Sequence, residues 1–488
     1  MQLDDYWGVG PKTRDLLREE LGDEAAAEAI ENADVRRLTD AGLPRGRATR
    51  IVRHAKGGEG LDVLATRDAR GVYKDVLERM VEFAVTEDAA DRISVLTPFT
   101  RPEKAEERLD RVLEARESWK ALDETERDEL LGVFDTYDEA GGGRRAAVEA
   151  ALGMKNRDFD DGVFSRFDGL DEETLEDALE SLTYLDRTGS SVEVRQGADD
   201  ELDRLRESLS AVRELEDGAL DVVESLRESR NLRDTEELRD ALVEHVVEEA
   251  DLDYAVVTDA TPDEAHDVTD FVTESLRSLS EEIEEEYEER ENEVVDELRE
   301  SIEDTEETVD EAVEAVDDLS LHISLARFSE EFDLTRPELV GETVAVVGAR
   351  NLSLVASDSE TDVQPVNYSV GENRVDDLPD DLISVLTGAN SGGKTTLLET
   401  LCQVVLLAQM GLPVPADEAQ VGTFDSVVFH RRHASFNAGV LESTLRSVVP
   451  PVTEGDRTLM LVDEFEAITE PGSAADLLHG LVNLTVER

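Results

Sequence analysis

Hydrophobic residues in the middle of the chain recur at alternating intervals of three and four over two stretches, residues 202–226 and 295–319. This spacing places the apolar side chains on one face of a helix and is typical of coiled coils. We expect the two helices to pair antiparallel as one projecting arm over residues 199–320. Because residues 281–318 are strongly acidic and would repel a phosphate backbone, we interpret the arm as a structural lever rather than a DNA-gripping surface.

Helical periodicity also dominates residues 58–198, which we predict to form a helical core. Its carboxylates are scattered as in the rest of the chain, so no pair stands out as a catalytic acid and base. Residues 57–60, Gly-Gly-Glu-Gly, indicate a linker before this core. Between the two coiled-coil stretches, the apolar residues 254–257 predict a short strand.

The pattern changes after residue 340, where short apolar runs alternate with one longer helical run. The short runs predict strands at residues 343–347, 382–386, 426–429 and 459–462, and the longer run predicts a helix from Lys394 to about Met410. Alternating apolar strands and helices indicate a predominantly parallel sheet covered by helices. The expected fold class is therefore multidomain and mostly α, followed by an α/β domain over residues 321–488.

The composition is strongly acidic. Among 488 residues, 120 Asp and Glu stand against 49 Lys and Arg, which gives a net charge of -71. This acidic, lysine-poor composition resembles that of proteins from extreme halophiles, whose carboxylates hold water and cations in concentrated salt. We favour this adaptation over a surface built for basic partners, so the net charge does not exclude nucleic acid as a partner.

Other compositional features narrow the class of protein. A single cysteine, Cys402, excludes an internal disulfide framework and a multi-cysteine metal site. The chain shows neither an amino-terminal signal pattern nor an apolar run of about 18 residues. We therefore expect a cytoplasmic protein with no membrane partner.

One part of the chain is basic. Residues 36–56 carry seven basic side chains and one acid. Glycine-containing turns at residues 7–13 and 41–48 each precede an apolar helix, and both resemble helix-hairpin-helix turns, the first more closely. In that motif, glycines let the backbone approach DNA, and amides at the start of the next helix bind a phosphate.

These turns predict a DNA-binding module over residues 1–57, in which basic side chains add contacts that do not depend on DNA sequence. A glycine-capped helical bundle without a ligand is the alternative. The candidate DNA contacts are Gly8, Gly10, Lys12, Gly42, Arg45, Gly46, Arg47 and Arg50.

Residues 388–395, Gly-Ala-Asn-Ser-Gly-Gly-Lys-Thr, have the spacing of a phosphate-binding loop. Lys394 is the only lysine after Lys155, and its flexible ammonium can reach the β- and γ-phosphates of a nucleotide. The Thr395 hydroxyl can ligate Mg²⁺. We predict ATP and Mg²⁺ as cofactors, with ATP bound by Gly388, Ala389, Asn390, Ser391, Gly392, Gly393, Lys394, Thr395 and Thr396.

A second nucleotide motif follows at residues 458–464, an apolar run that ends in two carboxylates. Asp463 would hold Mg²⁺ together with Thr395. Glu464 would orient or deprotonate the attacking water. We interpret Glu464 and Lys394 as catalytic residues of an ATPase.

The coiled-coil stretches lie wholly upstream of both nucleotide motifs. In SMC-like proteins the coil is inserted between those motifs, whereas the order found here resembles the MutS family. Residues 325–338, 387–396 and 409–419 carry the resemblance, with Asn390 at the position of the family's loop asparagine. The resemblance implies an ABC-type ATPase that dimerises, so that each subunit completes the other's site, and arms that close around DNA like a clamp.

The chain departs from that family in several places. The family's signature, a glycine pair followed by Ser-Thr-aromatic, is present only in altered form at residues 438–445, where Ser443 is the candidate that touches the partner's γ-phosphate. The run after Glu464 also differs. The hairpin turns stand where the family has its mismatch-reading domain. Because few residues follow Glu464, we expect an ATPase domain that is incomplete at its carboxyl end.

These features predict a divergent MutS-like protein of a halophilic, archaeal type that lacks the mismatch-reading domain. We expect a homodimeric, ATP-driven clamp on mismatched or branched double-stranded DNA that acts in repair or recombination. The alternative is a noncatalytic DNA clamp or scaffold that uses ATP as a structural ligand.

Overall fold

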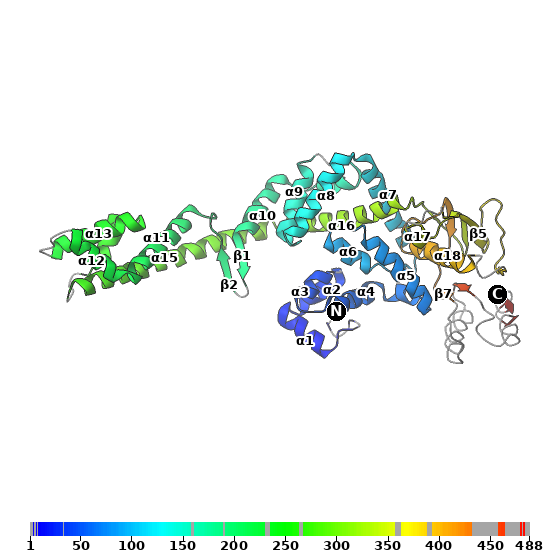
Figure 1. Ribbon diagram of the computed structural model, residues 1–488, viewed down its shortest axis with the longest axis horizontal. Helices are drawn as coiled ribbons and strands as arrows, with labels where there is room; N and C mark the ends of the chain where they lie inside the picture. The colour runs from blue at the N-terminus through cyan, green and yellow to red at the C-terminus, as the bar shows by residue number, and fades with distance from the viewer. Residues whose placement is uncertain are drawn as a thin grey trace. The chain divides into compact units, whose positions relative to one another are not determined.

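The computed structural model describes the chain except residues 1, 2, 4, 5, 7, 33, 158–160, 189, 190, 230–234, 263–266, 357–362, 388–392, 432–456, 464–478, 481 and 484–488 (Figure 1). Its internal contacts define two compact units. Unit 1 contains Met1–Ala146, Gly153–Gly169 and Val313–Arg488, and unit 2 contains Ala147–Leu152 and Leu170–Ala312. The four domains expected from the sequence follow a different division and stay predictions. Within the described residues, no helix is both long and apolar enough to cross a membrane.

Unit 1 begins with four helices packed around one apolar cluster. The helices are α1 (Pro11–Glu20), α2 (Asp23–Asn32), α3 (Val35–Asp40) and α4 (Arg45–Asp62). Pro11 opens α1, where its fixed φ suits the first helical turn, and the Asp34 carboxylate caps α3 by accepting from the Arg37 N–H at 2.7 Å. The fully buried members of the cluster include Leu17, Ile30, Leu38 and Ile51.

The linker predicted at residues 57–60 is wrong, because these residues lie inside α4. Gly60 is buried where α4 passes the backbone of Pro98. A Cβ atom on Gly60 would lie 2.1 Å from the Pro98 carbonyl oxygen. This glycine therefore permits a close approach within a helix and does not mark a boundary between domains.

The following helices of unit 1 are α5 (Arg67–Val81), α6 (Glu87–Ser94), α7 (Pro102–Ala121) and α8 (Glu124–Glu139), with a 3₁₀ helix at Gly162–Phe167. Helix α9 (Arg144–Lys155) is divided, because its residues Ala147–Leu152 belong to unit 2. Helix α16 (Glu306–Glu331) crosses from unit 2 into unit 1. Phe83, just after α5, packs with Phe328 of α16 and with Phe332, which directly follows that helix; the three ring centroids lie 5.1 to 5.8 Å apart. These ring contacts fix α16 against the end of α5.

Charged side chains gather, partly buried, between α6 and α16. Burial alone would raise the pKa of Asp318, but hydrogen bonds from Arg92 and Arg166, at 2.8 and 2.6 Å, lower it to about 2. Asp88 has the opposite surroundings: its Oδ2 atom is shielded from solvent and has no hydrogen-bond partner among the described residues. Burial and the nearby Asp317 raise the pKa of Asp88 to about 7.

The raised pKa of Asp88 makes stability depend on pH. The folded-state pKa lies above the ordinary value, so the folded protein favours the protonated Asp88 carboxyl. Its contribution to the free energy of unfolding is fully present below about pH 4 and is lost as the pH rises through about 7, by up to roughly 4 kcal/mol. We expect Asp88→Asn to melt at the same temperature as the wild type near pH 4 and several degrees higher at pH 8. Thermal unfolding at fixed salt measures this, with the exposed Glu87→Gln as control. A melting difference that does not change with pH would contradict it.

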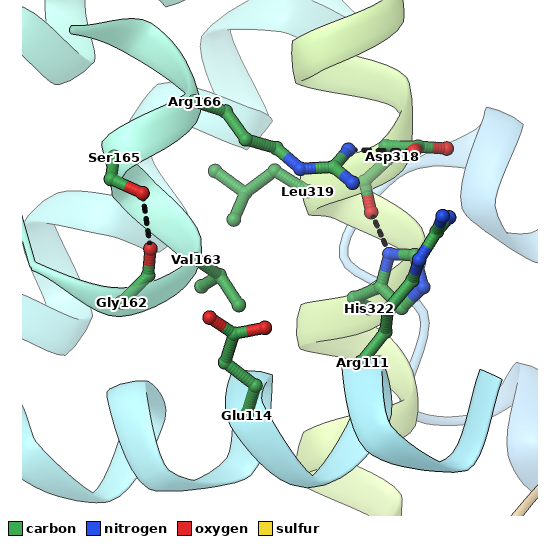
Figure 2. Close-up of a pocket in the computed structure, with 9 residues that line it drawn as sticks. All are labelled: Arg111, Glu114, Gly162, Val163, Ser165, Arg166, Asp318, Leu319 and His322. Carbon is green, nitrogen blue, oxygen red and sulfur yellow. Dashed lines mark hydrogen bonds and ion pairs between the residues drawn. The ribbon is translucent and has the colours of Figure 1, made fainter. Parts of the chain in front are cut away.

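A small cavity adjoins the same charged cluster, as Figure 2 shows. Its volume of about 90 Å³ is below the roughly 300–1,000 Å³ of ligand pockets. The His322 Nδ1 atom lies 2.6 Å from the Asp318 carbonyl oxygen, and burial lowers the pKa of His322 to about 4, so the ring is neutral. None of the predicted nucleotide or DNA contacts lines the cavity. Its lining is Arg111, Glu114, Gly162, Val163, Ser165, Arg166, Asp318, Leu319 and His322.

The carboxyl-terminal part of unit 1 contains two sheets. One has the strand order β3-β6-β4-β5, formed by β3 (Glu338–Leu339), β4 (Val344–Ala349), β5 (Val366–Val370) and β6 (Glu418–Val421). The other pairs β7 (Ser426–His430) parallel to β8 (Thr458–Val462). Helices α17 (Leu352–Val355) and α18 (Lys394–Gln409) complete this part, and α18 is buried over most of its length.

A mostly helical chain followed by a sheet region is confirmed, as are the helix starting at Lys394 and three of the four strands. The predominantly parallel sheet is wrong, because β4 runs antiparallel to both β5 and β6. The strand predicted at residues 382–386 is also wrong. This stretch is irregular, with Leu382 and Val385 exposed by 62% and 69%. An apolar run becomes a strand only where a neighbouring strand takes its backbone hydrogen bonds.

Unit 2 is built on the long helix α15 (Val268–Asp304), with α11 (Asp200–Asp217) antiparallel to it (Figure 1). The direction follows from two ion pairs, Arg290 with Asp199 at 2.8 Å and Arg213 with Glu284 at 2.6 Å. Helices α12 (Ala219–Ser229), α13 (Thr235–Ala250) and α14 (Tyr254–Asp259) share an apolar cluster with α11 and α15. Helix α10 (Glu172–Tyr184) and the hairpin of β1 (Leu185–Thr188) and β2 (Ser191–Val194) also pack against α15.

Two predictions for this unit need correction. The antiparallel pairing is present, and Leu202 of α11 shares an apolar cluster with Val295. Leu209 and Val212 of α11, however, pack with residues of α15 that precede residue 295. The end of α15 also contacts α10, where Ser181 and Ser301 are hydrogen-bonded at 2.7 Å. The strand predicted at residues 254–257 is instead the start of α14, because Val257 packs into a helical cluster that offers no strand edge. The role of this unit as a lever stays a prediction.

Candidate nucleotide-binding site

The phosphate-loop helix begins at a glycine with a left-handed backbone. Gly393 has φ +74° and precedes Lys394, the first residue of α18. Such a φ favours glycine, and it turns the chain directly into the helix. The amides at this helix start carry the positive end of the helix dipole, which suits a phosphate group.

The second motif meets the first at this helix start. The Thr395 Oγ1 atom donates a hydrogen bond to Asp463 Oδ2 at 2.5 Å. Asp463 directly follows β8 and is buried, and its N–H donates to the His430 carbonyl at 2.9 Å at the end of β7. The parallel register of β7 and β8 thus delivers the carboxylate to the hydroxyl. A hydroxyl and a carboxylate at hydrogen-bond distance are the kind of oxygen ligands that Mg²⁺ takes beside a nucleotide.

An ion pair also joins α18 to the end of β7, the two elements next to this pair. Arg431 forms an ion pair with Glu399 of α18 at 3.1 Å and lies over the Phe429 ring at 5.3 Å. Burial raises the pKa of the Glu399 carboxyl, and Arg431 opposes that rise. These contacts tie the end of β7 to α18, and neither residue belongs to a recognisable motif.

A buried polar network fixes α17 on α18. The Asn351 side-chain oxygen accepts from the Ser353 and Leu354 N–H groups, and its amide donates to Thr400 at 3.2 Å. The Gln403 side chain accepts from the Leu352 N–H at 3.0 Å. The bonds to Thr400 and Gln403 join α17 to α18 and so help to set the position of the phosphate-loop helix.

The predicted hairpin glycines lie at sharp backbone turns. Gly8 and Gly42 have φ of +84° and +89°, and Gly10 precedes α1. Gly46 lies in the first turn of α4. The turn conformations at the first two positions therefore favour glycine whether or not DNA binds.

The basic candidates differ in their surroundings. Lys12, Arg47 and Arg50 are exposed, and the two arginines donate to backbone carbonyls at 3.3 and 2.9 Å. Arg45 instead pairs with the nearly buried Asp91 at 2.8 Å, which gives it a role in holding α4 to α6. All four charges are exposed, and Arg45 is distinguished by its ion pair, with its side chain still 55% exposed.

Several predicted site residues lie outside the described residues. They are Gly388, Ala389, Asn390, Ser391, Gly392, Ser443 and Glu464. Their roles stay predictions. Thr396, also a predicted nucleotide contact, lies in the first turn of α18. Its carbonyl oxygen accepts a hydrogen bond from the Thr400 hydroxyl at 2.7 Å.

Comparison with known proteins gives a consistent result for the carboxyl-terminal part. Residues 384–464, which span both nucleotide motifs, match the family model of MutS domain V. The DNA-binding protein MutS2 of Pyrococcus furiosus is 40% identical over 159 residues, which cover 32% of this chain and 27% of that protein. The endonuclease MutS2 of Solidesulfovibrio magneticus is 32% identical over 172 residues, or 33% of this chain and 21% of that protein.

A mismatch repair protein gives a further match. The DNA mismatch repair protein MutS of Haloquadratum walsbyi is 27% identical over 155 residues, which cover 31% of this chain and 16% of that protein. All three matches span less than a third of the relative's own length. The similarity therefore concerns one domain.

Proposed function

The carboxyl-terminal part of this chain is an ATPase domain of the MutS family, and we propose that it binds ATP with Mg²⁺ and hydrolyses the nucleotide. The observation that carries this proposal is the hydrogen bond between Thr395 and Asp463. It joins residues of the two nucleotide motifs, and both side chains are oxygen ligands suited to Mg²⁺.

Each residue has a distinct chemical task in this proposal. Lys394 neutralises the β- and γ-phosphates, and the amides at the start of α18 hold phosphate oxygens. Thr395 and Asp463 hold Mg²⁺, which would supply positive charge at the phosphates. Glu464 orients the attacking water and accepts its proton. Ser443 of a second copy of the chain contacts the γ-phosphate, so turnover requires a dimer.

We further propose that the chain binds double-stranded DNA, with repair or recombination of mismatched or branched DNA as its task. The names of two relatives, a DNA-binding protein and a DNA mismatch repair protein, support this proposal. The exposed Lys12, Arg47 and Arg50 near the turns at Gly8 and Gly42 supply the first contacts.

Replacing Lys12, Arg47 and Arg50 together by alanine is expected to weaken DNA binding about tenfold or more at fixed salt. The slope of log affinity against log salt should become shallower by about 0.9 for each phosphate that the variant no longer neutralises. Fluorescence anisotropy with homoduplex, mismatched, forked and four-way DNA in molar KCl measures both quantities and shows which DNA form binds best.

The matched control replaces three exposed basic residues of unit 1 that lie outside the hairpin module, residues 1–57, and that form ion pairs with acidic side chains. Lys74, Arg111 and Lys120 pair with Glu78, Glu107 and Glu330 at 2.9, 3.1 and 2.8 Å. Their triple alanine variant carries the same charge change and should bind DNA as the wild type does. Equal losses in the two variants would show that net charge, and not the hairpin module, governs binding.

A noncatalytic clamp that holds ATP as a structural ligand is the second candidate, favoured by the altered signature around Ser443. Phosphate release by the wild-type chain with DNA and Mg²⁺ separates the two. Turnover supports the ATPase. Tight ATP binding without turnover, in a chain shown to be dimeric, supports the clamp.

A further inference from the structure

Strand β7 is held on one side by β8 and on the other by a segment far away in the sequence, residues 63–68. The Val427 N–H donates to the Val63 carbonyl at 2.7 Å, and the Ala65 N–H donates to the Val427 carbonyl at 3.2 Å. Leu64 and Val427 therefore form a parallel bridge. Residues 63–65 thus lie parallel to β7 on the side opposite β8, the strand that Asp463 directly follows.

The next step of this ladder is made by a side chain. Thr66 Oγ1 donates to the Phe429 carbonyl at 2.7 Å and accepts from the Phe429 N–H at 3.1 Å. It also accepts from the Ala69 N–H at 3.3 Å and thereby caps α5. A hydroxyl has one donor and two acceptor positions, so every one is used at this buried site.

A carboxylate continues the series. Asp68 Oδ2 accepts from the Arg431 N–H at 2.8 Å, one residue beyond the end of β7. The N–H groups of residues 427, 429 and 431 are thus all taken by residues 63–68. On the other side of β7, the His430 carbonyl takes the N–H of Asp463 at 2.9 Å. Asp463 is therefore held to a strand whose opposite edge rests on Thr66 and Asp68.

The same segment supports the other half of the metal pair. Thr66 caps α5, and α5 packs against both β7 and α18. Helix α18 carries Thr395 at its start. The Thr66 hydroxyl therefore joins α5 to β7. Helix α5 supports α18 and thus Thr395, and β7 supports β8 and thus Asp463, so both elements influence the distance between these two residues.

We propose that Thr66 is a positioning residue for the Mg²⁺ site, acting through β7 on Asp463 and through α5 on Thr395. This inference rests on the proposed function, because it assigns Thr66 to the ATP and Mg²⁺ site. Thr66 touches neither ligand. Its hydroxyl sets the distance between the Thr395 and Asp463 oxygen atoms. Loss of this hydroxyl therefore weakens Mg²⁺ binding more than it weakens ATP binding.

The test is Thr66→Val in the full-length chain, which keeps the shape of the side chain and removes the hydroxyl. ATP binding with EDTA should stay within about threefold of the wild type, whereas the half-saturating Mg²⁺ concentration for ATP binding and turnover should rise about tenfold. Thr66→Ser restores the hydroxyl and should return the Mg²⁺ dependence to that of the wild type. Nucleotide fluorescence titrations and phosphate release measure these values.

Thr86→Val is the matched control. Thr86 is equally buried, and its hydroxyl caps α6, rather than α5, by accepting from the Ala89 N–H at 3.0 Å. The variant should lower the melting temperature without moving the Mg²⁺ dependence. An unchanged Mg²⁺ dependence in Thr66→Val, or an equal shift in Thr86→Val, would overturn the positioning role alone. A wild-type chain that binds no ATP would overturn the proposed function and this inference with it.

Discussion

Replacing Lys394 by alanine is expected to lower ATP affinity by about 100-fold or more, because hydrogen bonds from a charged group contribute about 1.5–3 kcal/mol each and an ammonium offers three donors. Lys394 is the first residue of α18, so its side chain starts where the helix amides point. The remaining amides would still hold a phosphate weakly. Isothermal titration of ATP in molar KCl measures the loss.

The control for this variant is Lys74→Ala. Lys74 is 72% exposed and pairs with Glu78 at 2.9 Å within α5, so its removal changes the net charge equally without reaching the nucleotide site. It should bind ATP as the wild type does. Unchanged ATP affinity in a folded Lys394→Ala chain would exclude residues 388–395 as the phosphate-binding loop and remove the basis of the proposed function.

The nucleotide motifs could be predicted from the sequence because their chemistry is local. A lysine after two glycines at a helix start has few other uses, and the left-handed Gly393 before α18 fits that expectation. An apolar strand that ends in acids is also recognisable within a few residues. The contact between Thr395 and Asp463 brings the two motifs together at the start of α18.

The supports of the site could not be predicted, because they join distant parts of the chain. Thr66 and Phe429 lie 363 residues apart, and nothing near Thr66 distinguishes its hydroxyl from that of an ordinary helix cap. Gly60 shows the same limit, since its closeness to the Pro98 carbonyl cannot be read from the residues around it. Local sequence patterns predict helices and strands, whereas the distant residues that contact each helix or strand depend on tertiary packing.

The helices of unit 2 illustrate how periodicity fixes a face without fixing its neighbour. The apolar spacing at residues 295–319 is real, yet the structure divides that stretch between the end of α15 and the start of α16. Helix α11 packs along the acidic part of α15. There, Arg290 of α15 pairs with Asp199, and Arg213 of α11 pairs with Glu284. Hydrogen bonds from Arg290 and from the Leu202 N–H lower the pKa of Asp199 to about 2, which keeps this contact charged.

Replacing Asp463 by asparagine is expected to reduce ATP turnover on the order of 100-fold or more while ATP binding with EDTA changes little. Asparagine keeps the size of the side chain and an oxygen that can accept from Thr395, but it removes the negative charge that holds Mg²⁺. Raising the Mg²⁺ concentration should recover part of the lost turnover. Phosphate release against Mg²⁺ concentration, beside ATP titrations with EDTA, measures the two effects separately.

Asp425→Asn is the matched control, because Asp425 lies at the other end of the same parallel strands. Its carboxylate binds Arg457 at 2.7 Å, just before β7 and β8 begin. Breaking that pair should lower stability and leave the Mg²⁺ dependence of turnover unchanged, since the carboxyl ends of the strands carry the metal ligands. If Asp425→Asn and Asp463→Asn lost turnover equally, damage to the strand pair would explain both, and Asp463 would have no special role in holding Mg²⁺.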